Sequence, residues 1–307
     1  MKKHLILLTI LSISLSGIAQ IEPSPELMKF YTSQWDGPRD DHGRPMVSDS
    51  LLDRLLNLSI EEVWGVLRNE GYNNQFESGW VMLHEGQPFV GRALTAQYMP
   101  SRPDVNRQIM QLGRQEGRIG SSNSWPIDML KERDVYVADG YGKIFNGTLI
   151  GDNLGNSIYA KSKNGVVFDA GARDVEGLES IKGFNAFVRG FDPTYLMEEM
   201  LTGINVPIRI GSATVLPGDV VLAKREGVIF VPAHLVQKVV ITGEFTELRD
   251  QFGHAMLKAG VYTPGQIDSR WTQEIRNAFV KWLDENGDKL PMSRKELDEY
   301  MNNNRTW

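Results

Sequence analysis

The chain has 307 residues, of which 41% are hydrophobic and 23% are charged, a composition typical of a globular protein with a sizeable core. Its formal net charge of −6 argues against nucleic acid as the main partner, because phosphate binding needs a basic face. Cysteine is absent, which excludes disulfides, thiol catalysis and thiolate metal sites.

The first twenty residues have the layout of a secretory signal peptide. Lys2 and Lys3 supply a basic start, residues 5–15 are mostly apolar, and small residues follow before Gln20. This apolar run is shorter than the roughly 20 residues that span a membrane, so an uncleaved anchor is the weaker alternative. We therefore expect cleavage of residues 1–20, a periplasmic or secreted protein, and no membrane association afterwards.

Residues 21–58 are interpreted as an extended N-terminal arm that runs over the surface. The stretch DGPRDDHGRP within it is rich in proline, glycine and charged residues, which is typical of turns in a solvated segment. His42 beside Asp40 and Asp41 resembles a metal-binding group, but turn formation explains these residues more simply.

The next part of the chain begins with a helix signal. Ser59 followed by Glu62 forms a capping box and predicts a helix that runs through Leu67 and ends near Gly71. Residues 80–100 then predict a strand, a turn and a second strand, and residues 101–108 a polar loop.

Further along, strands and helices alternate. The pattern predicts the remaining segments in this order: a strand at 134–142, a strand or loop end feeding a helix over 149–164, strands at 165–174 and 184–190, and antiparallel strands over 205–232. The apolar spacing is helical from His234 to about Lys258, where Gly260 stops it, and again over about 272–285, with a polar tail that frays.

This order predicts one mixed α/β core at residues 59–260, with the arm before it and a helical extension at 261–307 after it. Two of its strands end alike, at Asp139-Gly140 and at Asp169-Ala170-Gly171. Acidic residues and glycines at the carboxyl ends of buried strands gather where ligands bind in α/β folds.

The dipeptide Arg173-Asp174 follows one of these strands. Neighbours on a regular strand point to opposite faces, but Gly171 indicates that the backbone is already turning, so both side chains can reach one cavity. Arginine offers a planar fork for a carboxylate, and aspartate a hard oxygen for a divalent cation. Together they suit a small 2-oxo acid. The competing interpretation is a surface turn with an incidental ion pair.

The segment GDNLGN at residues 151–156 is the second candidate. Gly151 permits a close approach of the backbone, and a helix that starts here offers free amides to an anion. The alternative for Asp152 or Asn153 is a structural role as the helix cap.

Five blocks in order resemble the RraA-like family, which includes class II pyruvate aldolases acting on 4-hydroxy-4-methyl-2-oxoglutarate and 4-carboxy-4-hydroxy-2-oxoadipate. The resemblance covers residues 60–260, and its blocks are FVGRALTAQYMP, DVYVADGYG, GTLIGDNLGNSIYAKSKNGVVFDAGARDVEGL, FVRG and NVPIRIGSATVLPGDVVLAKREGVIFVP. It implies a three-layer β/β/α core, assembly as trimers or hexamers, and active sites between subunits.

The resemblance also implies roles for single residues. Arg173 matches the arginine that holds substrate and stabilises the pyruvate enolate, and Asp174 the carboxylate that holds a divalent metal, Mg²⁺ or Mn²⁺. The segment that contacts substrate matches Gly151, Asp152, Asn153 and Leu154. Asp152 also lies where the family has an acidic residue near the metal-bound waters.

Two features remain open. Lys224 and Arg225 stand where the family usually has acids, so the turn faces either a more acidic substrate or, as we favour, solvent. A family acid from the neighbouring subunit is expected on the helix after residue 234, where Glu244 and Glu247 are the two candidates.

The sequence thus predicts a metal-dependent carbon–carbon lyase that releases pyruvate from a 4-hydroxy-2-oxo acid, with oxaloacetate decarboxylation as a side activity. One alternative is a non-catalytic regulatory protein of the RraA type, for which export is unfavourable. Another is an exported enzyme that acts on sugar-acid-like substrates.

Overall fold

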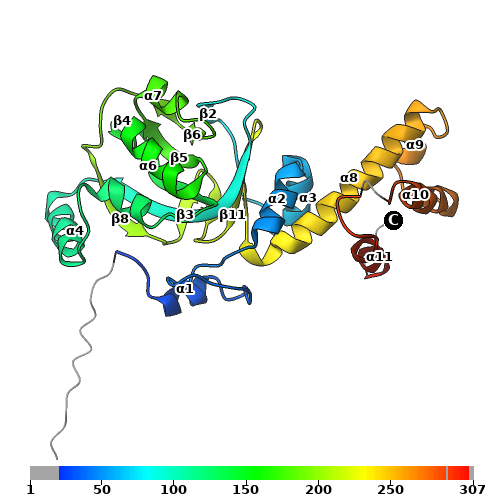
Figure 1. Cartoon of the computed structure of the whole chain (residues 1–307), viewed down its shortest axis with the longest axis horizontal. Coiled ribbons are helices and arrows are strands. Elements are labelled where there is room, and N and C mark those ends of the chain that lie inside the picture. The colour runs from blue at the N-terminus through cyan, green and yellow to red at the C-terminus, as the bar shows by residue number, and fades with distance from the viewer. Residues whose placement is uncertain (1–20, 288–289, 304–307) are drawn as a thin grey trace, which may run out of the picture.

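A ten-stranded mixed sheet forms the centre of the molecule in the computed structural model, which describes residues 21–287 and 290–303. The expected signal peptide at residues 1–20 lies outside this part of the chain. The sheet with its covering helices, and a separate helical lobe on one long helix, give the elongated outline in Figure 1.

The strands are short at the edges of the sheet and long at its centre. Those of the large sheet are β1 (Phe76–Glu77), β2 (Val81–Met82), β3 (Phe89–Pro100), β4 (Asp134–Thr148), β5 (Val166–Ala172), β6 (Ala186–Val188), β7 (Gly190–Phe191), β8 (Glu199–Ile204), β11 (Val220–Lys224) and β12 (Gly227–Val231). A separate hairpin consists of β9 (Ile208–Ile210) and β10 (Ala213–Val215).

The helices cover the sheet or form the separate lobe. They are α1 (Pro25–Tyr31), α2 (Asp49–Asn57), α3 (Ile60–Asn69), α4 (Pro103–Gln115), α5 (Trp125–Asp128), α6 (Asp152–Ser162), α7 (Val175–Glu179), α8 (Val236–Lys258), α9 (Pro264–Ile267), α10 (Gln273–Glu285) and α11 (Arg294–Asn303). Among the described residues, no helix is both long and apolar enough to cross a membrane.

The strand order is β1-β12-β11-β3-β4-β5-β6-β2, with β8 beside β3 and β7 beside β5. The central strands β3, β4, β5 and β6 run parallel, and the flanking pairs are antiparallel. Parallel neighbours need crossover connections, which here contain α4 and α5, then α6, then α7. The carboxyl ends of β4 and β5 therefore lie beside the starts of α6 and α7.

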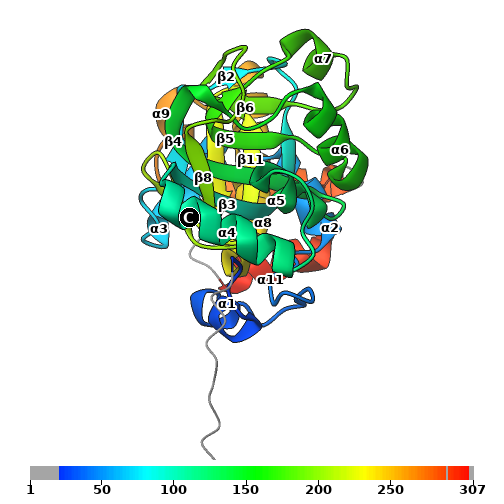
Figure 2. The ribbon, with the colours of Figure 1, turned by 90° about the vertical axis from the view of Figure 1, so that its left-hand side faces the viewer.

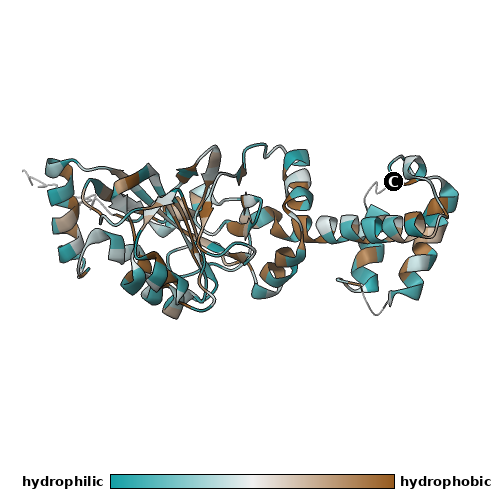
Figure 3. Cartoon of the chain, turned by 90° about the horizontal axis from the view of Figure 1, so that it is seen from above, coloured by the Kyte–Doolittle hydropathy of each residue, from teal (hydrophilic) through white to brown (hydrophobic). Residues whose placement is uncertain are grey.

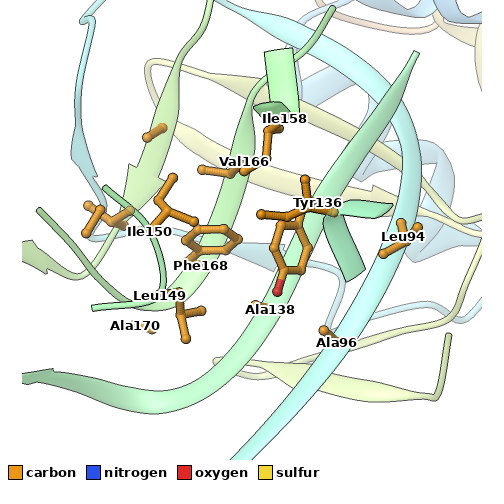
Figure 4. Packing of buried hydrophobic residues seen from close by; sticks show 14 of the residues in the cluster. Leu94, Ala96, Tyr136, Ala138, Leu149, Ile150, Ile158, Val166, Phe168 and Ala170 are labelled. Carbon is orange, nitrogen blue, oxygen red and sulfur yellow. The ribbon is translucent and has the colours of Figure 1, made fainter. Parts of the chain in front are cut away.

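One face of the sheet packs against α6 and α7. Alternation along β4 sends Tyr136 to this face and Val135 and Val137 to the other, because successive side chains on a strand point in opposite directions. Tyr136 meets Phe168 of β5 edge to face, with ring centroids 4.8 Å apart, as Figure 4 shows. Ile158 of α6 lies in the same cluster.

The opposite face is covered by the β9–β10 hairpin, whose Ile208, Ile210 and Val215 share a buried cluster with Val135 and Val137. The layers thus run helix, sheet, hairpin. The predicted β/β/α order and the extra C-terminal helices are confirmed.

The far end of the sheet, at β11 and β12, packs against α2, α3 and the first half of α8. The second half of α8 leaves the sheet and joins α10 and α11 in an aromatic cluster. In this cluster the ring centroids of Phe252 and Phe279 are 5.4 Å apart. Figure 3 shows apolar residues on the inner sides of both parts.

The N-terminal arm differs from the prediction. It contains α1 and α2, so it is not extended throughout, and Arg44 is only 1% exposed. The Arg44 guanidinium lies 2.8 Å from Asp134, which is fully buried, so the arm is packed on the core. The turn at Asp40 follows expectation, because its Oδ1 accepts hydrogen bonds from the backbone N–H groups of His42 and Arg44.

Two further helices lie in segments that were predicted as a polar loop and a fraying tail. Residues 101–108 were predicted as a polar loop, but α4 begins there with Pro103 in its first turn, a position that tolerates proline. The polar tail contains α11, whose Leu297 is fully buried. The capping box at Ser59 and Glu62 is confirmed, with both of its hydrogen bonds formed.

Candidate active site

Arg173 and Asp174 lie at the turn between β5 and α7. Asp174 adopts the left-handed conformation, with φ 58° and ψ 48°, which aspartate tolerates better than most residues. This turn brings both side chains to one side, where Arg173 Nη1 and Asp174 Oδ2 are 3.2 Å apart. Both side chains are more than one-third exposed, so a ligand can reach either.

The loop before α6 lies directly against this pair. The backbone N–H of Arg173 donates to the Ile150 carbonyl at 3.0 Å, which fixes the loop beside the end of β5. A Cβ atom on Gly151 would lie 2.2 Å from Asp174 Oδ2. Only glycine therefore leaves room for the Asp174 carboxylate in this position.

Asp152 comes from the first turn of α6. The N-cap of this helix is Gly151, with no side-chain cap bond, so the capping role considered for Asp152 or Asn153 is wrong. The Asp152 side chain packs on α7, where a Cβ atom on Gly177 would lie 2.6 Å from its Cβ. The starts of α6 and α7 thus face each other.

The predicted substrate residues share the wall of one small cavity, of about 80 Å³. They are Gly151, Asp152, Asn153, Leu154 and Arg173. A second, wider hollow beside it is bordered by Arg173, Asp174 and Asp192, and a third, open one by Asp152, Asp174 and Glu176. The structure brings all the predicted site residues together around the Arg173–Asp174 pair.

These residues fit a weakly held magnesium-type cation. Asp152 and Asp174 point toward the same open hollow and offer carboxylate oxygens, the donors that Mg²⁺ and Mn²⁺ prefer. Among the described residues, no group of three acidic or histidine side chains forms a closed metal site. Mg²⁺ usually keeps several waters and needs only one or two carboxylates, so the donor set is sufficient.

Several wall residues were not predicted as site residues, and three of them come from other segments of the chain. Asn123, Tyr195 and Leu196 complete the small cavity, and they come from segments far from Arg173 in the chain. Asn123 donates to the Leu149 carbonyl at 2.8 Å, and Thr148 Oγ1 donates to the Thr194 carbonyl. No local pattern marks these residues, because only long-range packing places them at the site.

The two acidic strand ends do not join this site. Asp139 and Asp169 are paired across β4 and β5, but neither borders the hollows around Arg173. Asp169 forms an ion pair with Arg189 at 2.6 Å. Burial raises the pKa of Asp139, and the nearby Asp169 adds to the effect. Both belong to a neighbouring charged cluster.

The two features left open lie near α8. Glu244 is buried and accepts hydrogen bonds from Arg54 at 2.8 and 2.5 Å, so it is held within its own chain, and Glu247 is the more accessible candidate. Arg225 is exposed, as favoured, whereas Lys224 is half-buried near acids of α3 and α8. α7 follows the Arg173–Asp174 turn, and in Figures 1 and 2 it lies well apart from α3 and α8. These residues are therefore distant from the candidate site of the same chain.

Comparison with known proteins shows the family of the chain. The RraA-like family model (Aldolase/RraA) matches residues 45–230. DlpA of Legionella pneumophila is 26% identical over 200 residues, which cover 62% of this chain and 29% of DlpA. A 4-hydroxy-4-methyl-2-oxoglutarate aldolase of Thermus thermophilus is 27% identical over 118 residues, which cover 38% of this chain and 71% of that enzyme. The chain therefore spans less than a third of DlpA.

Two solved structures share the fold. An uncharacterised protein of Pseudomonas syringae pv. tomato aligns with a TM-score of 0.60 and 23% identity, over 76% of this chain and 98% of that one. RraAS2 of Streptomyces coelicolor, described as an unusual member of the RNase ES inhibitor RraA family, aligns with a TM-score of 0.59 and 26% identity, over 71% and 99%. The resemblance inferred from sequence is confirmed: the chain belongs to the RraA-like family of aldolases and RraA proteins.

Proposed function

We propose that the protein is a carbon–carbon lyase that cleaves a 4-hydroxy-2-oxo acid to pyruvate with the help of a divalent cation, Mg²⁺ or Mn²⁺. The observation that carries the proposal is the convergence of Arg173, Asp174 and the 151–154 loop on one group of hollows that share these residues in their walls. Arg173 supplies a cation that can bind an oxyanion, and Asp174 supplies a carboxylate that can bind a metal. The 151–154 loop permits the close approach of a ligand.

Arg173 binds the substrate. Its guanidinium borders both the small cavity and the wider hollow, so it can bond the carboxylate and the 2-oxo oxygen of one ligand. The same contact strengthens as negative charge develops on the 2-oxo oxygen, which is where preorganised electrostatics contribute most to rate.

Asp174 is the residue that would hold the cation directly, and Asp152 would do so through water. A divalent cation bound there supplies Lewis-acid polarisation of the 2-oxo group. Gly151 keeps the space that the Asp174 carboxylate occupies.

The bond changes follow from aldol cleavage. A base takes the proton of the C4 hydroxyl, the C3–C4 bond breaks, a carbonyl forms at C4, and the electron pair leaves pyruvate as its enolate. Protonation of C3 then gives pyruvate. We assign proton transfer to Asp152, the carboxylate next to Asp174 in the open hollow. Oxaloacetate decarboxylation forms the same enolate and is the expected side reaction.

The test uses the purified chain without residues 1–20, in MgCl₂ or MnCl₂, with a panel of 4-hydroxy-2-oxo acids and release of pyruvate as the readout. We expect Arg173→Ala to lower kcat/KM roughly 100-fold, as loss of an oxyanion contact does. Arg225→Ala, at an exposed arginine near α3, is the matched control and should retain full activity. Absence of pyruvate with every substrate, or full activity in Arg173→Ala, contradicts the proposal.

The same panel separates the alternatives. A non-catalytic binding protein, suggested by the likeness to RraAS2, needs neither the cation nor Arg173, so calorimetric titration with Mn²⁺ would show no binding that depends on Asp174. Activity only on 2-oxo acids derived from sugar acids would identify the exported-enzyme alternative.

Export itself predicts a mature N-terminus near residue 21, which N-terminal sequencing of the secreted protein can measure.

A further inference from the structure

A second cavity, of about 250 Å³, lies at the junction of the N-terminal arm and the far end of the sheet. Its walls are residues 31–35 at the end of α1, Tyr72 and Gln75 after α3, residues of the 214–219 segment, and residues 232–234 before α8. It shares no wall residue with the hollows around Arg173. Figures 1 and 2 place α1 on the opposite side of the molecule from α7.

The cavity is held open by hydrogen bonds in two of its walls. Arg39 donates to Thr32 Oγ1 at 2.7 Å and to the carbonyls of Thr32 and Trp35 at 2.8 Å each, which fixes the 32–35 turn. Across the cavity, the Gln75 amide donates to the carbonyls of Thr214 and Phe230 at 3.3 and 3.0 Å. A ligand would therefore meet preformed walls, which lowers the entropic cost of binding.

Aromatic rings and uncharged polar groups dominate the lining. Tyr31, Trp35 and Tyr72 contribute rings. The Tyr72 hydroxyl lies 3.3 Å from His234 Nε2, so a hydroxyl and an imidazole meet at one wall. Ser33 and Gln34 add an exposed hydroxyl and an exposed amide at the rim. Such a mixture offers flat apolar faces together with hydrogen bonds in several directions.

The lining of the cavity carries few charged groups. Within the described residues, no lysine or arginine borders the cavity, which disfavours an anionic ligand. Asp219 is the one carboxyl among these lining residues, and burial raises the pKa of this group to about 7. Asp219 Oδ2 already accepts the Leu216 backbone N–H at 2.8 Å, which ties it to its own turn. Burial also lowers the pKa of His234. A cationic ligand would find no free full negative charge.

We propose that this cavity is a binding site for an uncharged sugar ring. The C–H face of such a ring packs on the aromatic side chains, and its hydroxyls bond to Tyr72, His234 and the rim groups. Two of the walls, residues 31–35 and 232–234, lie outside the 45–230 span that matches the family. The site thus combines residues of the core with residues 31–35 of the N-terminal arm, and it is independent of the proposed lyase chemistry.

Ligand-observed NMR titration of the full chain without residues 1–20 tests the site. The probes are glucose, galactose, N-acetylglucosamine and cellobiose, with glucuronate and glucosamine as charged counterparts. We expect at least one neutral sugar to bind in preference to both charged ones. Trp35→Ala should weaken that binding about threefold to tenfold through lost ring contact, and Tyr72→Phe should do so roughly twofold to tenfold through the lost hydroxyl.

Trp64→Ala is the matched control, because Trp64 is a partly exposed tryptophan of α3 outside the cavity wall, and it should leave sugar binding unchanged. Thermal unfolding shows whether each variant is folded, and Tyr72→Phe keeps the ring in case Trp35→Ala loosens the turn. The proposal is overturned if no neutral sugar binds, if a charged counterpart binds more tightly, or if both cavity variants bind like the unmodified protein. Pyruvate release is measured separately, so failure of one proposal leaves the other to its own test.

Discussion

Gly151 lies so close to the Asp174 carboxylate that a side chain at position 151 must displace it. The added Cβ would be 2.2 Å from Asp174 Oδ2 and 3.3 Å from Arg173 Cγ. Backbone strain plays no part, because the residue has φ −123°, which any residue can adopt. The requirement for glycine therefore comes from the contact alone.

Gly151→Ala is expected to lower pyruvate release roughly 100-fold, because displacement of a catalytic group by about 1 Å has that effect. Thermal unfolding should change little. The matched control is Gly65→Ala within α3, where nothing lies within 4 Å of the new methyl group. That variant should keep full activity and gain about 0.5–1 kcal/mol of stability. Equal activity in both variants would argue against the assigned role of Asp174.

Glu199 is a second residue whose behaviour depends on its surroundings, because its carboxyl group is buried. It is 5% exposed, and within the described part of the chain neither carboxylate oxygen has a hydrogen-bond partner. Burial raises its pKa to about 8, with Asp139 adding to the shift and Lys143 opposing it. The folded protein therefore binds this proton more tightly than the unfolded chain does.

This pKa makes stability depend on pH in a defined direction. Between about pH 4.5, the ordinary pKa of a glutamate, and about pH 8, the free energy of unfolding should fall as pH rises, by up to about 1.4 kcal/mol per unit. Glu199→Gln should flatten this slope and make the protein more stable than the unmodified one at pH 8. The buried Asp219, with a pKa near 7, leaves part of the slope. Urea unfolding at several pH values measures how the free energy of unfolding changes with pH.

Glu198→Gln is the control for this experiment, since its carboxylate is half exposed and bonded to Lys143. Its pKa is lowered by the side chains of Lys143 and Asn146, so this variant should not flatten the slope. An unchanged slope in Glu199→Gln would show that the carboxyl titrates normally in the folded protein.

At the level of elements, the N-terminal arm is joined to the sheet by a buried ion pair. Arg44 binds both Asp40 within the arm and Asp134 at the start of β4. Asp134 also accepts the backbone N–H of Lys131, and Arg92 lies 3.8 Å away. Loss of Arg44 leaves the Asp134 charge buried with weak compensation.

Arg44→Ala should therefore lower the free energy of unfolding by about 3 kcal/mol, the usual effect of breaking a buried ion pair. Lys295→Ala on α11 serves as the control, because its ion pair with Glu299 is exposed and 3.8 Å long and should contribute little. Urea denaturation of both variants provides the comparison. Equal stability of the two would mean that the arm is not anchored through this pair.

At the level of the whole molecule, exposed apolar side chains gather next to the candidate site. Phe145 and Tyr195 are each 60% exposed and Met197 is 56% exposed. The end of β4, which carries Phe145, and the loop that carries Tyr195 and Met197 are joined, because the backbone N–H of Met197 donates to the Asn146 carbonyl at 2.9 Å. Tyr195 also borders the small cavity, so a partner on this surface would lie beside the site. Exposed apolar patches of this kind mark interfaces.

The family resemblance implies trimers or hexamers, and we propose that such an assembly forms through this surface, as measured by light scattering after size-exclusion chromatography. The double change Phe145→Ser with Tyr195→Ser should shift the mass toward the monomer. Ile119→Ser, at a residue 82% exposed outside this surface, should not. A monomeric unmodified protein, or a double variant that assembles normally, would be inconsistent with this interface.

Features encoded within a few residues were predictable. The Ser59–Glu62 capping box, the VVF strand that becomes β5 and the turn at residues 173–174 each follow from neighbouring residues. The order of such segments was also sufficient for the fold and the family. The convergence of the predicted site residues follows from that order too, because α6 and α7 both start beside the carboxyl ends of parallel strands.

Features that depend on distant partners were not predictable. The charged arm appeared solvated because Asp134, the buried partner of Arg44, lies 90 residues away, and α4 was missed because its first residues are polar. Asn123 and Tyr195 reach the site only through packing. The amino-acid order alone thus determined the fold, the paired chemical groups and most strands but not β8, since their signals are local. Only the tertiary structure decided which charges are buried and which cavities form, because burial and enclosure depend on surfaces that the folded chain brings together.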